Sequence, residues 1–571
     1  LPFAAVTASA NQSLVSPGYS STIGGVSNQG TVHSSSNNPA SNNTLVREGE
    51  RIRFGYLSNF GGYFEIGESD DLDGKVNDLV DDMDAADSDS FNEAYLQQRY
   101  PSVDTTDMSD SEKEAAYFEA IANRANTELV ADLEKGGQFR AGFQLQAPLT
   151  PFLVRSKKAR GTFSINASAS TQIRGGFIGS PFGVKTTFKD VQVDGVATDV
   201  PLNLDLGKAA GAYTEIDKVL NDSPDGTTES QKITDIIVIA ERNGLIAGND
   251  KAINTLIESY NITASDVDGL SDDQKKSLAL QGVNVPGYTL EQASVQPAQT
   301  TTGITTKNEL TTNSGFDIKA AAITHLGVGY GTNLSEWFEL NRKHGELEMG
   351  LRANLYQVEA GRNFISIQAE SNAKGDDDAF DKATEDFFEN TAKTTAVGVD
   401  LGFLWHSEHY QVGLTFYNLN EPTIDYPNMA DYLEGETLAA IQGLEQAGKT
   451  KVTDSVTLTR HAVIEGAMYS ANRNWMVQGS YTLGTATNFV GDEFQTMAVS
   501  AGYFPKSWWA PGLRAGYSQN LVGAELSKVH LGMTMFGSLH LDMAASLDSS
   551  SFDGNDIPRY VGFSLGFEEK F

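Results

Sequence analysis

The sequence has no cysteine, no long apolar run and comparatively little positive charge. Without cysteine among its 571 residues, the chain cannot form disulfides, and this composition fits an exported protein that avoids oxidative mispairing. No stretch of about 18 uninterrupted apolar residues occurs, so no helix is predicted to span a membrane. Lysine and arginine number 41 against 75 aspartate and glutamate residues, a formal net charge of -34. This balance disfavours nucleic acid as a partner, because phosphate binding needs clustered cations.

Toward its end, between Val456 and Phe571, the sequence alternates apolar and polar residues. One run carries Trp475, Val477, Tyr481 and Leu483 on one face, and the interleaved positions of the whole stretch include His461, Glu465, Gln478, His530 and Asp542. A period of two predicts strands. Strand after strand of about ten residues, joined alternately by tight turns and long polar loops, is typical of a membrane barrel. The mean hydropathy of -0.30 does not oppose this, because a barrel strand shows only half of its residues to lipid.

Residues 1–48 have a different composition, rich in serine, asparagine, glycine and alanine and almost free of charge. Such a segment cannot build a core of its own. Its small side chains instead suit a narrow space inside another structure, so we expect this segment to thread through the barrel.

Two groups of residues resemble the FadL and TraF-like outer-membrane proteins. Gly24 and Gly25 are followed by the plug motif Asn38, Pro39 and Ala40 just before the first predicted strand. A second group, residues 397–422, reads as a hydrophobic strand, a short turn and a strand closing on Asn-Leu. The resemblance implies an all-β fold: a transmembrane antiparallel β-barrel of about 14–16 strands in a Gram-negative bacterial outer membrane. It also implies a lumenal plug formed by residues 1–48, a barrel formed by residues 49–571, and contacts with outer-membrane lipid and lipopolysaccharide.

The chain departs from that family pattern in two insertions, residues 69–135 and 207–298, which have helical periodicity and no FadL counterpart. Glu569 also occupies a place near the end that such barrels usually fill with an apolar residue. The first insertion opens with a run of aspartates, beginning at Asp70, that resembles a calcium loop but lacks the required spacing. A divalent cation at the acidic loops is therefore the one cofactor left open, and no defined metal site is predicted.

Catalytic motifs are weak. Gly562 to Gly566 spells Gly-x-Ser-x-Gly, but the chain continues as a strand instead of turning sharply into a helix as a hydrolase would. Residues 406–409 bring two histidines and a glutamate together, as a metal site would, but they lie between two strands, where a polar turn is expected. We therefore predict no catalytic residues and no enzyme activity.

Two sets of residues are expected to lie at the membrane interface and in the barrel lumen. The tryptophans fall near the short-turn ends of strands, where an interfacial aromatic belt is expected; they are Trp405, Trp475, Trp508 and Trp509. The candidate lumen-facing residues are charged side chains at inward positions of strands, namely Glu348, Arg352, Asp400 and Asp542. These charges favour a polar lumen.

Two functions follow from the resemblance. FadL-like proteins imply passive transport of small hydrophobic molecules through a gated lumen. TraF-like proteins imply a structural or assembly component of an envelope machine, for conjugation or a surface appendage, with an envelope protein as partner. The lumen should distinguish them, because a conduit needs an apolar pocket whereas a scaffold can be filled with salt bridges.

The topology is predicted by counting turns backward from Phe571, whose strand should end in the periplasm. The short links, including residues 359–362 and 407–409, then fall on the periplasmic side, and the long ones fall outside. This count places the insertion 207–298 in the periplasm. If residues 184–206 form one strand rather than a hairpin at Asp194 and Gly195, it places the insertion 69–135 at the cell surface.

Overall fold

The structure, a computed structural model, describes residues 18–28, 30–46, 49–68, 72–86, 91–106, 108, 110–193, 196–204, 305–339, 344–372, 387, 389–507, 509–552 and 555–568. The chain divides into two compact units. The barrel unit comprises residues 1–72, 133–178 and 315–571, and the insertion unit comprises residues 73–132 and 179–314.

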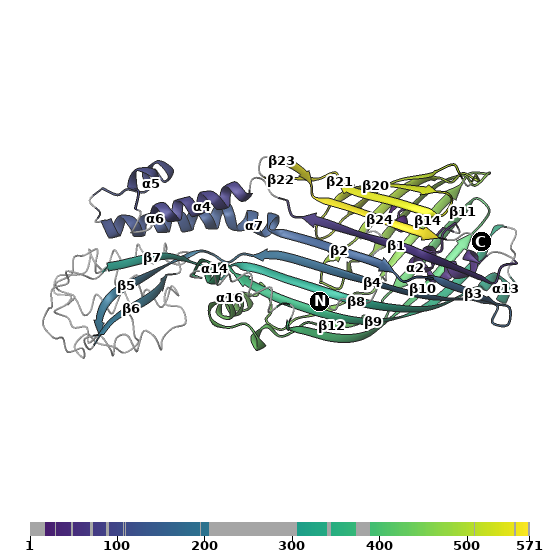
Figure 1. Cartoon of the computed structure of the whole chain (residues 1–571), viewed down its shortest axis with the longest axis horizontal. Coiled ribbons are helices and arrows are strands. Elements are labelled where there is room, and N and C mark those ends of the chain that lie inside the picture. Colours follow the sequence, from purple (N-terminus) through teal and green to yellow (C-terminus); the bar gives the residue numbers. More distant parts are fainter. Residues whose placement is uncertain are drawn as a thin grey trace, which may run out of the picture. The chain divides into compact units, whose positions relative to one another are not determined.

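The barrel unit is a single antiparallel sheet that closes on itself (Figure 1). Its strands are β1 (Ile52–Ile66), β2 (Gln138–Gln146), β3 (Phe152–Ser156), β4 (Gly161–Ile178), β8 (Gly315–Asn333), β9 (Glu346–Ser366), β10 (Thr391–His406), β11 (Tyr410–Tyr417), β14 (His461–Tyr469), β15 (Trp475–Leu483), β18 (Thr496–Tyr503), β19 (Gly512–Asn520), β20 (Ser527–Met535), β21 (Leu539–Ser546) and β24 (Tyr560–Glu568). The first strand pairs with the last. The short strands β2 and β3 each pair with both β1 and β4, so they lie one after the other in the gap between these two strands. The two short strands therefore share one position, and the barrel has 14 strands, as the sequence predicted.

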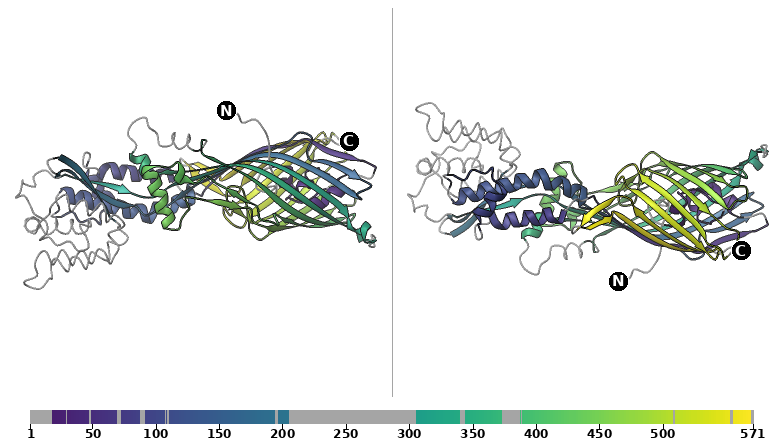
Figure 2. Two further views of the ribbon diagram at one scale, coloured as in Figure 1. Left: turned by 90° about the horizontal axis from the view of Figure 1, so that it is seen from below. Right: turned by 90° about the horizontal axis from the view of Figure 1, so that it is seen from above.

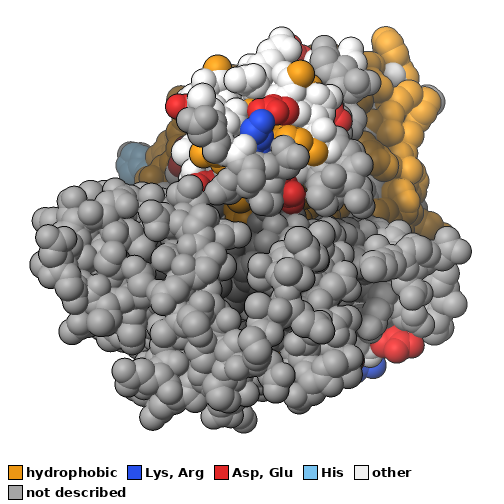
Figure 3. Space-filling view, turned by 90° about the vertical axis from the view of Figure 1, so that its left-hand side faces the viewer, with side chains coloured by type: hydrophobic (Ala, Val, Ile, Leu, Met, Phe, Trp, Pro, Cys, Tyr) orange, Lys and Arg blue, Asp and Glu red, His pale blue; other side chains and the backbone are white. Residues whose placement is uncertain are grey.

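Side chains alternate between the two faces of the barrel wall. In β15, Trp475 and Val477 are exposed whereas Met476 and Gln478 are buried, and the same alternation runs through β24. The exposed positions are largely apolar, and such side chains gather at one edge of the described surface in Figure 3. An apolar outer face with a largely polar inner face is the pattern of a barrel surrounded by lipid.

The described part of the N-terminal segment, drawn in purple, lies inside the ring of strands in both views of Figure 2. Its described part, residues 18–46, contains four short helical turns: α1 (Tyr19–Thr22), α2 (Ser34–Asn37), η1 (Pro39–Ser41) and α3 (Asn42–Leu45). Nearly all of these residues are buried although most are polar. We call residues 18–46 the plug. Residues 1–17 of the predicted plug lie outside the described residues.

The insertion unit combines helices with a small separate sheet. The helices are α4 (Leu72–Ala86), α5 (Glu93–Arg99), α6 (Asp110–Arg124) and the π-helix η2 (Ala125–Leu129), which continues into α7 (Val130–Gly136). The sheet contains β5 (Gly183–Val193), β6 (Val196–Leu204) and β7 (Thr305–Thr311). Tyr117, Phe118 and Ile121 of α6 are buried in its core with Phe182 and Leu310. No helix in the described part of the chain is long and apolar enough to cross a membrane.

The small sheet corrects the interpretation of residues 184–206 as a possible wall strand. Residues 184–193 and 196–204 form the two paired strands β5 and β6, as the hairpin alternative predicted, but β5 pairs with β7 and neither strand pairs with the barrel. Strand propensity and alternation are the same in either sheet, so the local pattern could not separate them. The insertion 207–298 lies outside the described residues.

Strand β9 corrects the predicted topology. The short turn expected at residues 359–362 does not exist, because β9 runs unbroken for 21 residues and pairs there with β8 throughout and with β10 as far as Gly361. Each strand reverses direction, so the extra turn inverted the side assigned to the insertion 207–298. The wall strand assumed at residues 184–206 reversed the count a second time, so the insertion 69–135 stays with the long links.

The corrected count gives the barrel two different ends. The short-link end holds links such as residues 407–409, 470–474 and 536–538. The long-link end holds the links that contain α14 (Ile367–Asn372), the elements β12 (Thr423–Asp425), η5 (Met429–Asp431), α16 (Gly435–Gln446) and β13 (Ser455–Thr457), the hairpin β16 (Ala486–Thr487) with β17 (Glu493–Phe494), and the hairpin β22 (Ser549–Phe552) with β23 (Asn555–Pro558). Both insertions leave the barrel at the long-link end. The first connects β1 to β2 at this end, and the second connects β4 to β8. The predicted placement of the two insertions on opposite sides was therefore wrong.

Candidate functional site

The candidate site is the lumen, where inward-facing charges of the wall hold the plug. Arg352 of β9 donates from Nε and Nη2 to Oδ2 of Asp400 on β10, at 2.9 and 2.8 Å. Its remaining nitrogen, Nη1, donates to the backbone carbonyls of Ser35 and Ser36 in the plug, at 2.8 and 2.7 Å. Both partners of this ion pair are buried. One guanidinium therefore joins two wall strands to the plug.

A second buried pair lies on the opposite part of the wall. Arg514 of β19 donates from Nη2 to Asp542 on β21 at 2.7 Å and from Nε to the hydroxyl of Thr22 at 2.9 Å. The Thr22 hydroxyl in turn donates to Asp542 at 2.8 Å. The guanidinium also lies 4.1 Å from the centre of the Tyr19 ring, within the range of a cation–π contact. The start of the plug is thus held by charge-assisted bonds.

The plug motif contacts the wall where the wall carries no side chain. Asn38 donates to Glu465 of β14 at 3.1 Å and caps the turn η1 through the backbone N–H of Ala40. A Cβ atom added at Gly350 would overlap the backbone of Pro39 and Ala40, and one at Gly402 would overlap the Asn38 side chain. Glycine at these strand positions lets the plug backbone approach the wall closely.

The four lumen-facing residues chosen from the sequence are all buried at inward positions of the wall. Arg352, Asp400 and Asp542 belong to the two ion pairs above, and Glu348 accepts a hydrogen bond from Asn43 of the plug at 3.0 Å. Sequence reasoning did not select Glu465 or Arg514. The same signal could have found both, since each is a charged residue at an inward position of an alternating strand.

The tryptophans chosen from the sequence lie outside the lumen. Trp405, Trp475 and Trp509 are exposed, and each lies at the short-link end of a strand or in a short link. Trp405 packs edge-on against Tyr410, with ring centres 5.5 Å apart. Trp508 lies outside the described residues.

At the long-link end, the inner wall becomes apolar and the loops cover it. Ile323, Tyr356 and Val358 of the wall are buried in one cluster with loop residues. The Phe489 ring packs edge-on against Tyr356, and its carbonyl accepts a hydrogen bond from the Tyr426 hydroxyl at 2.8 Å. We call this group the mouth cluster. It fills the long-link end of the lumen with side chains from two loops.

Charged groups surround the mouth cluster. Lys319 forms an ion pair with Asp454, and Arg362 pairs with Asp317 at 2.8 Å. Burial by itself would raise the pKa of the Asp454 carboxyl, but the ammonium of Lys319 and the guanidinium of Arg362 lower this pKa below its usual range. A recess of about 690 Å³ lies beside these groups, and its lining includes Arg174, Lys319, Lys449 and Asp454. Its lining is thus mostly polar and carries charges of both signs.

The acidic residues of the first insertion were expected to leave a cation site open. In the described part, Asp82 is fully buried and accepts hydrogen bonds from Arg99 Nε at 3.1 Å and Arg124 Nη1 at 2.9 Å. The hydroxyls of Tyr95 and Tyr100 also donate to Asp82. Burial next to this carboxylate raises the pKa of both tyrosines. Protein cations therefore neutralise this acidic group, while the acidic runs 266–269 and 376–378 lie outside the described residues.

Comparison with known proteins now identifies the chain. No curated protein matches it. Solved structures with some similarity include a TodX deltaS2S3 mutant monoaromatic hydrocarbon channel, with 8% identity over 76% of this chain and 84% of that chain and a TM-score of 0.28. They also include the siderophore receptor PiuA from Acinetobacter baumannii, with 9% identity over 76% of this chain and 56% of that chain and a TM-score of 0.21. A third is the FrpB iron transporter from Neisseria meningitidis, with 9% identity over 76% of this chain and 63% of that chain and a TM-score of 0.18.

These TM-scores are low. The family comparison is different, because residues 36–482 match the model of the family described as "F plasmid transfer operon, TraF, protein". This match covers most of the chain, from the plug to the end of β15, and it agrees with the TraF-like resemblance of the sequence motifs. The chain therefore belongs to this TraF family.

Proposed function

We propose that the protein is an outer-membrane barrel whose lumen is sealed, and that it serves as a structural or assembly component of an envelope machine. The observation that carries this proposal is the plug, which is held by polar side chains from the whole circumference of the wall. More than eight wall residues bond to it, and eight of them are Arg53, Arg155, Arg352, Gln411, Tyr417, Glu465, Ser480 and Arg514. A pathway through the lumen is closed while these bonds persist.

The energy of this interface is large compared with thermal energy. A net value of about 1 kcal/mol per intramolecular hydrogen bond gives about 8 kcal/mol for one bond from each of the eight residues. Since about 1.4 kcal/mol corresponds to a factor of ten, spontaneous release of the plug would occur in on the order of one molecule in 10⁵ to 10⁶. Steady passive diffusion through the lumen would need a partner or ligand that opens it.

The outer-membrane location is part of the same proposal. It is supported by the apolar outer face of the wall and by the exposed tryptophans at the short-link end. If the chain's end lies in the periplasm, as is general for such barrels, the long-link end and both insertions face the cell surface. Outer-membrane lipid and lipopolysaccharide would then contact the wall, and an envelope protein would contact the loops or the insertion unit.

A second candidate function, passage of small hydrophobic molecules as in FadL-like proteins, is favoured by one observation. The mouth cluster is apolar on its wall side, where Ile323, Tyr356 and Val358 lie beneath loop residues. If the loops moved, these side chains would offer a hydrophobic molecule a first binding place. The polar plug lies beyond it, so this function also requires release of the plug.

The test compares the full chain with two deletions in planar bilayers and in liposomes. We expect the full chain and a variant lacking residues 1–17 to show little conductance, and a variant lacking residues 1–46 to conduct strongly. Liposomes with the full chain should take up a long-chain hydrophobic probe no faster than empty liposomes. Saturable uptake of that probe by the full chain would overturn the sealed-scaffold proposal and favour the second candidate.

Assembly needs its own experiment. A photoreactive residue at Glu128, an exposed position of the insertion unit, should cross-link in intact cells to a defined envelope protein. Loss of the chain should prevent assembly of the complex that contains this protein. A complex that assembles normally without the chain would contradict the scaffold role.

A further inference from the structure

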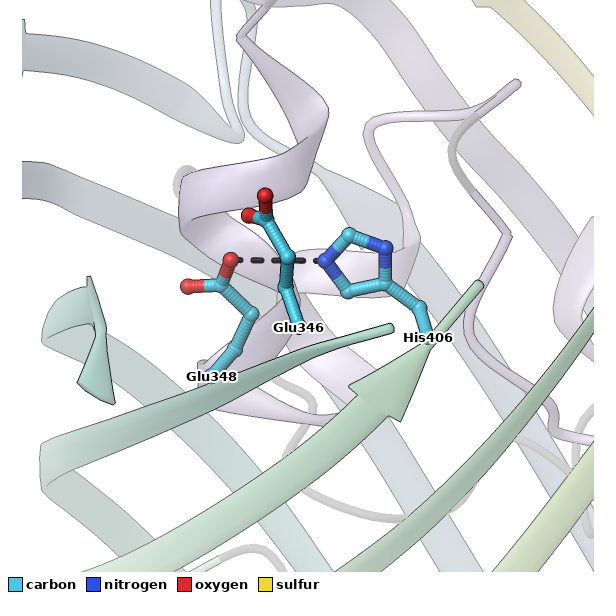
Figure 4. A group of neighbouring side chains, drawn as sticks. All are labelled: Glu346, Glu348 and His406. Carbon is cyan, nitrogen blue, oxygen red and sulfur yellow. Dashed lines mark hydrogen bonds and ion pairs between the residues drawn. The ribbon is translucent and has the colours of Figure 1, made fainter. Parts of the chain in front are cut away.

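Strand pairing brings three side chains that can bind a metal ion together at the short-link end of the barrel. Strands β9 and β10 pair antiparallel, with His406 opposite Glu346 and Leu404 opposite Glu348. Residues two apart on a strand share a face, so Glu346, Glu348 and His406 all belong to the inner face of the wall. Figure 4 shows the two carboxylates and the imidazole converging from the start of β9 and the end of β10.

The distances between these groups suit a metal ion. The imidazole Nε2 of His406 lies 3.4 Å from Oε1 of Glu348. Donor atoms of all three side chains lie within 4.8 Å of one another. Tetrahedral zinc with ligand bonds of about 2.0–2.1 Å places its ligand atoms about 3.3 Å apart. Since the present separations are at most 4.8 Å, side-chain rotations that bring the donor atoms closer by up to about 1.5 Å would give this spacing.

The charge balance at Glu348 is a second reason to expect a cation. This carboxylate is only 2% exposed, and buried charges in proteins are usually paired or bind metals. The ion pair found for Glu348 among the described residues is with His406, and its other contact is with the neutral amide of Asn43. Glu346, which also accepts a hydrogen bond from Asn333, brings a second carboxylate to the same place.

We propose that Glu346, Glu348 and His406 bind one divalent transition-metal ion of the zinc type. One nitrogen and two oxygen ligands suit Zn²⁺ and leave a fourth position for water. Asn43 belongs to α3 of the plug and orients Glu348, so the bound ion stabilises the plug against the wall. This inference does not depend on whether the barrel is a scaffold or a conduit.

The neighbouring turn provides a matched control. Glu408 and His409 lie two and three residues after His406 but are exposed in the short link between β10 and β11. The variant Glu408→Gln/His409→Gln therefore changes the same residue types as Glu346→Gln/His406→Gln, at a site without a buried carboxylate.

The experiment uses the untagged full chain in detergent, cleared of metal with a chelator and then titrated with Zn²⁺ in the presence of excess Ca²⁺, which occupies the acidic surface. We expect one Zn²⁺ per chain for the parent and for the control variant, and at least a hundredfold weaker binding for Glu346→Gln/His406→Gln. Co²⁺ should give the visible spectrum of a nitrogen- and oxygen-bound ion only in those proteins that bind Zn²⁺. No stoichiometric ion in the parent, or equal binding by the Glu346/His406 variant, would overturn the site.

Coupling to the plug is tested separately with a cysteine reporter. In a Ser35→Cys background, Zn²⁺ should slow labelling of the buried thiol by a thiol reagent, and Asn43→Ala should weaken Zn²⁺ binding about tenfold, as loss of a ligand-orienting partner typically does. Zn²⁺ binding that leaves the labelling rate unchanged would refute the coupling. Heat-dependent migration on gels checks that each variant retains the folded barrel.

Discussion

The contact between Arg352 and the plug can be broken by one substitution with a calculable effect. Arg352→Leu removes two charge-assisted hydrogen bonds to the carbonyls of Ser35 and Ser36. Bonds of this kind contribute about 1.5–3 kcal/mol each, so the plug should lose about 4 kcal/mol of its attachment. At about 1.4 kcal/mol per factor of ten, the fraction of molecules with a released plug should rise about a thousandfold.

The assay uses the absence of native cysteine. A single Ser35→Cys change places a thiol at a fully buried plug position, and its labelling rate reports how often the plug leaves the wall. Arg352→Leu should accelerate labelling by about three orders of magnitude. The control Arg460→Leu removes an arginine that is largely exposed and pairs with Glu421 in a loop, and exposed pairs contribute at most about 1 kcal/mol.

A double variant separates plug release from general destabilisation. Arg352→Leu alone leaves Asp400 as an unpaired buried charge, which costs about 3–5 kcal/mol of stability. Arg352→Leu/Asp400→Asn removes that charge but still lacks the bonds to the plug. We therefore expect both variants to label rapidly and the double variant to be the more heat-stable. Labelling of Arg352→Leu within threefold of the parent rate would refute the reasoning.

Three further predictions concern other parts of the molecule. Gly350→Ala should release the plug, because the new methyl group meets the plug backbone, whereas Gly176→Ala, with open space around it, should label at the parent rate. Asp82→Asn should destabilise the helices around it by about 3–5 kcal/mol, seen as faster hydrogen exchange in residues 110–124; unchanged exchange would contradict the role of Asp82. The lowered pKa of Asp454 means that its pairing with Lys319 stabilises the loop above the ordinary carboxyl pKa and is lost as pH falls below it. Proteolysis of residues 418–460 should therefore be similar at pH 7 and 5 and faster at pH 3, and a uniform rate would argue against this pair.

Local sequence pattern was sufficient to predict the strands and the direction of their side chains. Alternation places every second residue on one face, so Glu348, Arg352, Asp400 and Asp542 could be assigned to the inner face without knowing the partners of their strands. Composition likewise separated the uncharged plug from the wall. Both the alternation and the composition are properties of short segments, and each can be recognised without knowing the tertiary structure.

Local pattern failed where one local sequence is compatible with two different structures. Glu359, Gly361 and Arg362 have the composition of a polar turn, yet they continue β9, because β8 pairs with all three and β10 pairs with Glu359 and Gly361 on the other side. Residues 184–204 have the composition of a wall strand, yet they pair in the small sheet. In both cases the hydrogen-bond partner decided the structure, and that partner is distant in the sequence.

Residue patterns along the chain were thus enough to predict a barrel with a polar, charged lumen and a small-residue segment to fill it. Which inward charges meet depends on the pairing of distant strands. The pairing of strands brings Arg352 to Asp400 and to the plug, and it brings His406 to Glu346 and Glu348 rather than to Glu408 and His409 beside it in the sequence. The physical reason is that parity along a strand is a local property, whereas register between strands depends on the hydrogen bonds of the closed sheet.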